Sequence, residues 1–269
     1  MHSLLFKIIK APYYILLFLL LKNSLQAAEN NLLIYAAAST NDIFKEIQKN
    51  FTEKLNINIR ISSSSSSTLA KQIISGAPTN IYISASRLWI NELNKKKLLD
   101  KNYLKPIFKN KLVLIAPIDT EIKYLKNLNK KNLLNLFNKY LRNSRISIAD
   151  PSHVPAGIYT KEALTKLKVW QHLNRDNMAW GGDVRRTLKF VALGNSPLGI
   201  VYHTDAIAEP KVKIIGAFDD NLHSPINYWA TIIKKNNNEH SIRLFNFLSS
   251  NSAKNLYTNH GFEIIGIKK

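Results

Sequence analysis

The feature that most constrains the fold is a regular alternation of short apolar segments with amphipathic ones. From Asn31 onward, apolar runs typical of buried strands are followed by residues spaced as on one face of a helix. We expect strands at 31–38, 57–61, 80–85, 111–117, 146–150, 197–206 and 227–235, and helices at 43–55, 68–75, 87–99, 158–167, 181–194 and 241–260. This alternation predicts α/β architecture with largely parallel sheets.

The length of 269 residues allows one large domain or two medium ones. The late strand at 227–235 indicates two α/β lobes, with the chain crossing between them near Ile115 and near Tyr228. The expected organisation is residues 28–114 for the first part of lobe 1, 115–227 for lobe 2 and 228–269 for the return to lobe 1. Ligands of such sheets bind beyond the carboxyl ends of the strands, where helices begin.

The first residues have the pattern of a secretory signal peptide. Lys7 and Lys10 precede the apolar run 11–21, and the small residues Ala27 and Ala28 follow. We predict a signal peptide at 1–27, cleaved after Ala27 or Ala28. An uncleaved anchor is the alternative, but the run is shorter than the roughly 20 residues of a spanning helix. Either reading places the domain outside the cytoplasmic membrane, and the periplasm is the expected location.

Composition excludes several function classes. The chain has no cysteine, which rules out disulfides, thiolate metal sites and a lipid-modified N-terminal cysteine. The net charge of +20 invites a nucleic-acid interpretation. However, the lysines are scattered among asparagine and isoleucine, and no basic recognition segment stands out. We therefore expect no nucleic-acid partner, although a basic surface would attract an anion.

Four loops share a pattern in which a strand end leads into small or helix-starting residues. Each would present free backbone N–H groups at a helix N-terminus, which is a ready anion site. One such loop means little, but four converging on a cleft would define a binding site. The loops are 36–40, 63–68, 154–159 and 181–186.

The second of these loops ends a run of six serines, Ser62 to Ser67. Serine runs are typical of flexible linkers. This one stands between a strand and a helix inside a lobe, so a linker is a poor interpretation. We expect 62–64 to end the strand and the last serines to be held by a helix that starts near Thr68.

Several segments, in order and with compatible spacing from Leu32 to Phe262, resemble the periplasmic molybdate-binding proteins of ABC uptake systems. They are "AAAS", "SSSTLAKQI", "GAP" with "IYISA", "DPSHVPAGIYTKEAL", "DVRRTL" and "PLGIVYHTDA". The resemblance implies a two-lobed periplasmic-binding-protein fold that closes around molybdate or tungstate in the interlobe cleft. It also implies delivery to the permease and ATPase of an ABC transporter, with no cofactor, and we expect a monomer.

The resemblance also implies the ligand contacts. Ser39 and Ser66 would each offer a hydroxyl and a backbone N–H from one lobe, with Ser67 as the alternative if the register differs by one. Ala156 and Val184 would offer backbone N–H groups from the other lobe, and Tyr202 a hydroxyl. By its position alone, Tyr202 is more typical of a core residue. No residue is expected to ligate a metal cation directly, because the metal is carried as an oxyanion.

The sequence departs from the family pattern at a few places near these contacts. None of these departures removes a hydrogen-bond donor. His203 and Trp180 are the two departures that bear on which oxyanion the site selects. The departures are Thr40 and Asn41 after Ser39, Asn80 after "GAP", Trp180 in the "AWGG" before Asp183, and His203 after Tyr202.

The donors themselves predict a selectivity. Backbone N–H groups only donate, and the serine and tyrosine hydroxyls can be turned to donate. An anion without a proton satisfies every donor, whereas hydrogen phosphate would bring in an O–H at a cost of roughly 1–3 kcal/mol. Sulfate has no proton, so a binding protein for sulfate is the main alternative.

A serine hydrolase is a less favoured alternative. Ser39, His153, His203 and Asp150 supply the residue types for it. The chain has no G-x-S-x-G motif, and none of its seven histidines pair at i, i+4. We therefore predict a binding protein rather than an enzyme.

Overall fold

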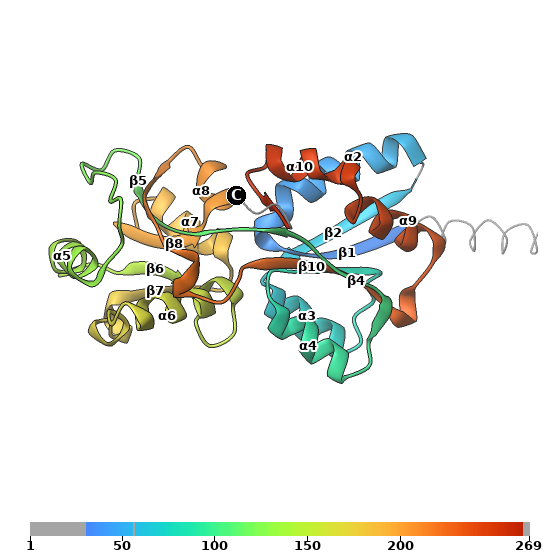
Figure 1. Ribbon diagram of the computed structural model, residues 1–269, viewed down its shortest axis with the longest axis horizontal. Helices are drawn as coiled ribbons and strands as arrows, with labels where there is room; N and C mark the ends of the chain where they lie inside the picture. Colours follow the sequence, from blue (N-terminus) through green and yellow to red (C-terminus); the bar gives the residue numbers. More distant parts are fainter. Residues whose placement is uncertain (1–30, 56, 266–269) are drawn as a thin grey trace, which may run out of the picture.

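The computed structural model describes residues 31–55 and 57–265, so the predicted signal peptide at 1–27 lies outside the described residues. The chain forms two lobes, each a sheet with helices packed against it (Figure 1). The prediction of a two-lobed α/β fold is confirmed. Within the described part of the chain, no helix has the length and apolar character needed to cross a membrane.

The first lobe is built on a six-stranded sheet with the order β11-β4-β10-β3-β1-β2. Figure 1 shows α2, α9 and α10 on one side of this sheet and α3 and α4 on the other. The strands are β1 (Asn31–Ala37), β2 (Asn58–Ser64), β3 (Ile81–Ser84), β4 (Leu99–Lys109), β10 (Asn227–Ile233) and β11 (Glu263–Ile264). The helices are α2 (Asn41–Leu55), α3 (Ser66–Ile74), α4 (Arg87–Lys95), α9 (Glu239–Leu248) and α10 (Lys254–Asn259).

The second lobe is built on a five-stranded sheet with the order β7-β6-β8-β5-β9. Its strands are β5 (Leu112–Pro117), β6 (Ile146–Ala149), β7 (Met178–Gly181), β8 (Leu198–Tyr202) and β9 (Val212–Ala217). Its helices are α5 (Lys130–Tyr140), α6 (Pro155–Lys166), α7 (Val184–Ala192) and α8 (His203–Ile207). Within the described residues there are also single 3-10 turns at η1 (Ala38–Thr40), η2 (Trp170–His172), η3 (Arg175–Asn177), η4 (Asp220–Leu222), η5 (Lys234–Asn236) and η6 (Asn251–Ala253).

Both sheets are mixed, which corrects the expectation of largely parallel sheets. Strand β1 runs parallel to β2 and β3, and β6 runs parallel to β7 and β8. The antiparallel pairs all involve β4, β5 or β10. These three strands lie next to the crossings between the lobes, and each of them runs antiparallel to both of its neighbours in the sheet.

The chain leaves the first sheet after Lys109 and enters the second at Leu112. It returns between Ala217 and Asn227. The first crossing therefore comes earlier than the expected position near Ile115, and the return ends just before Tyr228. The division of the chain into lobes at 114/115 and 227/228 stays a prediction.

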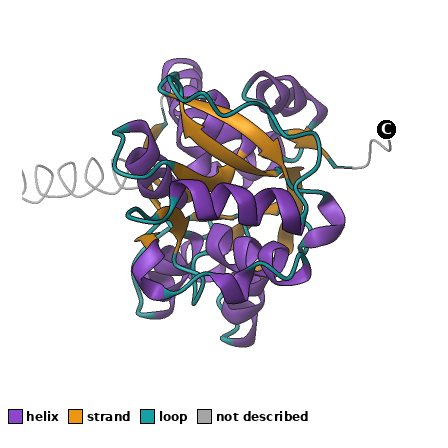
Figure 2. Ribbon diagram, turned by 90° about the vertical axis from the view of Figure 1, so that its left-hand side faces the viewer, coloured by secondary structure: helices purple, strands orange, loops and turns teal. Residues whose placement is uncertain are grey.

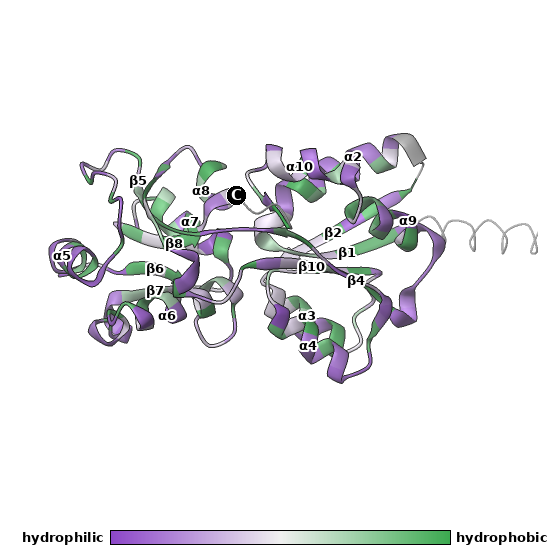
Figure 3. Cartoon of the chain, in the orientation of Figure 1, coloured by the Kyte–Doolittle hydropathy of each residue, from purple (hydrophilic) through white to green (hydrophobic). Residues whose placement is uncertain are grey.

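Apolar residues of the strands and the inner faces of the helices form the core. The helices α3 and α4 cover one face of the first sheet with Leu69, Ile73, Ile90 and Leu93, all of which are buried. Figure 3 shows hydrophobic and hydrophilic residues side by side on these two helices, as expected for helices with one buried face. In Figure 2, helices surround the strands of the molecule.

Two expected elements differ from the structure. The strand expected at 197–206 ends at Tyr202, and the next five residues form helix α8. The helix expected at 241–260 is divided into α9 and α10. Serine and asparagine compete for backbone hydrogen bonds, and the Ser250 hydroxyl donates to the Phe247 carbonyl at 2.7 Å where α9 has ended.

Strands β4, β7 and β9 and helix α5 were not anticipated. Strand β4 carries lysines and Pro106, which are unfavourable in a strand. Proline is accommodated because the register between β4 and β10 shifts next to Trp229, the partner of Pro106. Pairing with β10 therefore overrides local propensity in this segment.

Candidate functional site

A narrow cavity lies where the N-termini of α3, α6 and α7 meet the 3-10 turn η1 and the end of β8. All five residues expected at the ligand line it, and the lobes contribute as expected: Ser39 and Ser66 from the first, Ala156, Val184 and Tyr202 from the second. The other lining residues are Ala37, Ala38, Ser65, Ala85, Val154 and Pro155. Among the described residues that line the cavity, none carries a charge.

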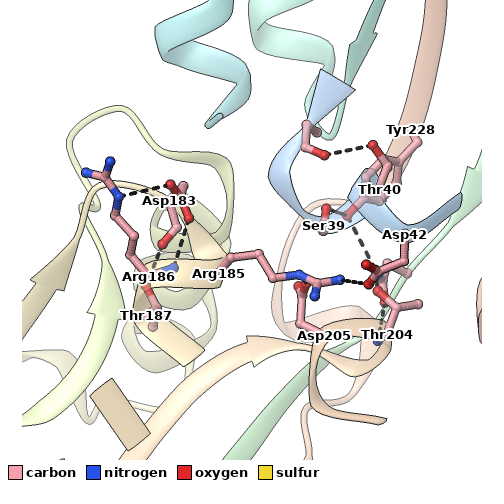
Figure 4. A network of polar contacts seen from close by, with 12 residues as sticks. Ser39, Thr40, Asp42, Asp183, Arg185, Arg186, Thr187, Thr204, Asp205 and Tyr228 are labelled. Atoms are coloured by element: carbon pink, nitrogen blue, oxygen red, sulfur yellow. Dashed lines mark hydrogen bonds and ion pairs between the residues drawn. The ribbon is translucent and has the colours of Figure 1, made fainter. Parts of the chain in front are cut away.

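The Ser39 hydroxyl is held by a tyrosine. Strand β1 ends at Ala37, and the chain turns through η1, so Ser39 is buried with an exposed fraction of 3%. Its Oγ lies 2.6 Å from the hydroxyl oxygen of Tyr228, the second residue of β10 (Figure 4). The hydroxyl of Thr40 instead donates to the Ala37 carbonyl, which stabilises the turn. Ser39 therefore has a fixed side chain at the cavity wall.

The serine run divides between a strand and a helix. Residues 62–64 belong to β2, as predicted, and Ser65 is the N-cap of α3, accepting a hydrogen bond from the Thr68 N–H. The helix therefore begins at Ser66, two residues before the expected start. A serine N-cap satisfies one of the free amides of the first turn, which explains why the helix starts inside the run.

Ser66 faces the cavity and Ser67 does not line it. The Ser66 Oγ accepts a hydrogen bond from the Ala85 N–H at 3.0 Å, and the Tyr82 hydroxyl donates to the Ser66 carbonyl at 2.7 Å. The Ser67 hydroxyl lies 2.9 Å from the Ser65 hydroxyl. Ser65 is a further lining residue that sequence reasoning did not single out.

Helix α6 brings Ala156 to the cavity with its amide free. Val154 at the N-cap makes no side-chain hydrogen bond, and Pro155 has no N–H, so Ala156 carries the first amide without an intrahelical acceptor. A Cβ added to Gly157 would lie 2.2 Å from the Ala149 carbonyl oxygen. Glycine at this position therefore allows the end of β6 to approach the helix start closely.

Helix α7 brings Val184 to the cavity in a similar way. Asp183 is the N-cap, and its carboxylate accepts a hydrogen bond from the Arg186 N–H at 2.9 Å. The amides of Val184 and Arg185 are left without an intrahelical acceptor. The N-termini of α6 and α7 thus present amides and partial positive charge from the second lobe.

Tyr202 is buried, and its hydroxyl makes no hydrogen bond to the described residues. Its exposed fraction is 2%, and its hydroxyl oxygen has no hydrogen-bond partner among the described residues. Burial raises the pKa of Tyr202 well above its ordinary value, so the hydroxyl keeps its proton at neutral pH. Its ring meets that of Tyr228 edge-on, with the centroids 6.2 Å apart. An unpaired buried hydroxyl is unfavourable by about 1–3 kcal/mol, which marks this atom as one that needs a partner.

Charged residues stand behind the cavity rather than in it. The guanidinium of Arg185 pairs with Asp42 of the first lobe at 2.7 Å and with Asp205 of α8 at 2.5 Å (Figure 4). Asp205 is fully buried, and burial raises its pKa to about 6 although Arg185 beside it acts in the opposite direction. Sequence reasoning missed this cluster, and its only sequence signal is that Arg185 follows Val184.

Two more hydrogen bonds join the lobes beside the cavity. The Tyr159 hydroxyl of α6 donates to the Ala85 carbonyl at 3.0 Å. The Trp89 Nε1 of α4 donates to the His153 carbonyl at 3.1 Å. With the Arg185–Asp42 pair, these contacts hold the two lobes together around the site.

The residues of the hydrolase alternative are not brought together. The Ser39 hydroxyl pairs with Tyr228, whereas His153 lies near Asp150, with 3.7 Å between its Nδ1 and the carboxylate. Among the described residues that line the cavity there is neither histidine nor aspartate. Trp180 and His203, the departures that bear on selectivity, are also absent from the described lining.

A neutral set of hydrogen-bond donors between two α/β lobes defines a solute-binding protein. Residues 32–263 match the bacterial extracellular solute-binding proteins, and the chain belongs to this family. It is similar to the molybdate-binding protein ModA of Haemophilus influenzae, with 38% identity over 88% of this chain and 91% of that protein. It is also similar to ModA of Escherichia coli K12, with 34% identity over the same shares.

A solved structure with the same architecture is the periplasmic molybdate-binding protein of Azotobacter vinelandii. Its TM-score is 0.74, and the alignment covers 87% of this chain and 99% of that one. The identity is 21%, so this likeness concerns the fold.

Proposed function

We propose that the protein captures molybdate or tungstate outside the cytoplasmic membrane, in the periplasm, and delivers it to the permease and ATPase of an ABC transporter. The relatives support this proposal, because both are named molybdate-binding proteins. The observation that carries it is the Tyr202 hydroxyl, buried and unpartnered among the described residues at a cavity with free helix amides.

The chemistry of the site suits a dianion that carries no proton. The anion accepts hydrogen bonds from the hydroxyls of Ser39, Ser66 and Tyr202 and from the amides of Ala156 and Val184. Each hydrogen bond to a charged acceptor contributes roughly 1.5–3 kcal/mol. A helix N-terminus adds about 0.3–1 kcal/mol. These donors replace the hydration that the anion loses on burial, and no basic side chain is needed.

The site supports binding without chemical conversion, so we propose a carrier rather than an enzyme. Ligand binding closes the lobes about the two crossings, and the closed form is the one that the permease recognises. The protein works as a monomer in this scheme and uses no cofactor.

Calorimetry of the processed protein with molybdate, tungstate, sulfate and phosphate tests the proposal. We expect tight binding of molybdate and tungstate, much weaker binding of sulfate and weaker still of phosphate. Tight binding of sulfate without binding of molybdate would assign the protein to sulfate instead. Small-angle scattering tests the closure separately: the radius of gyration should fall when molybdate is added, and an unchanged value contradicts closure.

A further inference from the structure

The Ser39 hydroxyl belongs to a chain of buried polar groups that starts at Asn110, the residue that begins the first crossing. The Asn110 Nδ2 donates to the Tyr228 hydroxyl at 3.3 Å, and that hydroxyl lies 2.6 Å from the Ser39 Oγ. Tyr228 is fully buried, and Asn110 and Ser39 are buried beside it. The chain therefore runs from the connection between the lobes to the cavity wall.

The orientation of the Asn110 amide is set by its neighbours. Its Oδ1 accepts from the backbone N–H of Lys111 at 2.9 Å and from that of Thr204 at 3.5 Å. Backbone N–H groups only donate, so the oxygen must be on their side and the Nδ2 must face the hydroxyls of Thr204 and Tyr228. The Nδ2 contacts the Thr204 Oγ1 at 2.8 Å. Asn110 therefore acts on Tyr228 as a donor.

This donation determines where the Tyr228 proton goes. A phenol has one proton, and the Asn110 Nδ2 cannot accept it. The Ser39 Oγ is the other hydrogen-bond partner of the Tyr228 hydroxyl among the described residues. Leaving a buried O–H unpaired is unfavourable by about 1–3 kcal/mol. The Tyr228 hydroxyl therefore donates to Ser39, and the proton of Ser39 is left to point away from Tyr228.

We propose that Tyr228 is a positioning residue that fills one acceptor position of the Ser39 hydroxyl and turns its proton toward the ligand, and that it thereby contributes to the rejection of protonated oxyanions. Ser66 has the same arrangement, because its Oγ already accepts from the Ala85 N–H. Both serines thus have an acceptor position filled from behind and a proton free for the ligand. This inference rests on the proposed function, since it assumes that an oxyanion occupies the cavity.

The test compares two anions that differ in protonation, selenate and hydrogen arsenate, as competitors of molybdate near pH 7. In Tyr228→Phe the Ser39 hydroxyl is free to rotate and accept from a ligand O–H. We expect the ability of arsenate to displace molybdate, relative to that of selenate, to rise by roughly tenfold over wild type. The substitution removes one oxygen atom and keeps the ring that packs on Phe108 and Phe262.

A matched control is Tyr257→Phe, because the Tyr257 hydroxyl is also buried but donates to the Leu248 carbonyl within the first lobe. This variant should keep the wild-type ratio. Asn110→Asp supplies a second test, since a carboxylate accepts from Tyr228 and so reverses the chain of hydrogen bonds. It should raise the ratio as well.

Equal losses for both competitors in Tyr228→Phe, with the ratio unchanged, would show a purely structural role and overturn the inference. The inference would also be overturned if arsenate displaced molybdate from the Tyr228→Phe variant no better than from wild type. Failure of the proposed function is distinguished from failure of this inference by the wild-type protein: if the proposed function is wrong, wild type does not bind molybdate.

Discussion

Arg185 follows Val184 at the start of α7, and its guanidinium lies 2.7 Å from the carboxylate of Asp42, which belongs to the other lobe. Its second partner, Asp205, lies behind it in its own lobe and is fully buried. The ion pair with Asp205 holds Arg185 on the second lobe and directs it toward Asp42 (Figure 4). A residue next to a proposed ligand contact thereby joins the lobes.

Asp42→Asn should weaken molybdate binding by up to about fivefold, because it removes an attraction between the lobes that would favour the proposed closure. The effect is modest because Asp42 is 39% exposed, and such pairs contribute about 0.2–1 kcal/mol. Calorimetry at low and at high salt measures it, and the effect should shrink with salt. Glu92→Gln, which removes a surface ion pair within one helix, is the control. Equal losses in both variants would contradict a role in closure.

Tyr202→Phe should lower molybdate affinity by roughly 10- to 150-fold, which corresponds to one hydrogen bond to a charged acceptor. The ligand-free variant should be as stable as wild type or more stable, because the hydroxyl that it loses is buried without a partner among the described residues. Calorimetry and thermal unfolding measure the two effects. An unchanged affinity would assign Tyr202 to the core alone.

Ser66→Ala and Ser67→Ala distinguish the two serines. Ser66 lines the cavity, so its variant should bind molybdate at least tenfold more weakly. Ser67 lies behind it and bonds to Ser65, so its variant should lose about 1 kcal/mol of stability and keep its affinity. Titration calorimetry with urea unfolding separates the outcomes. The reverse order of affinities would assign the contact to Ser67.

The pH dependence of stability should report on Asp205. Burial raises its pKa from 3.8 to about 6, so the folded protein holds this proton more tightly than the unfolded chain. Its contribution to the free energy of unfolding is therefore fully present below about pH 4 and is lost as the pH rises through about 6. Asp42 and Asp183 favour the same direction, and Arg185 opposes it.

Asp205→Asn has no proton to titrate and should lack this dependence. The melting temperature of ligand-free wild type, minus that of the variant, should fall as the pH rises from 4 to 6.5 and then level off. Parallel curves for the two proteins over this range would contradict the assignment.

Much of the fold could be predicted because local patterns agree with tertiary structure. The apolar run of β1, the helical spacing after it and Gly76 beyond α3, with φ of 92°, all act through neighbouring residues. Strand β4 could not be predicted in this way. Its lysines and Pro106 disfavour a strand, and only pairing with β10, far along the chain, stabilises it.

The sequence by itself determined the alternation of strands and helices for many of the elements, the four loops that end at helix N-termini and, through family resemblance, the residues expected at the ligand. The tertiary structure alone decided that these loops meet, that Ser66 rather than Ser67 lines the cavity, and that Tyr228 and Asn110 stand behind Ser39. The reason is physical. Helix starts depend on neighbouring residues, whereas the direction of a hydroxyl and the pairing of Arg185 with Asp42 depend on groups brought together only by folding.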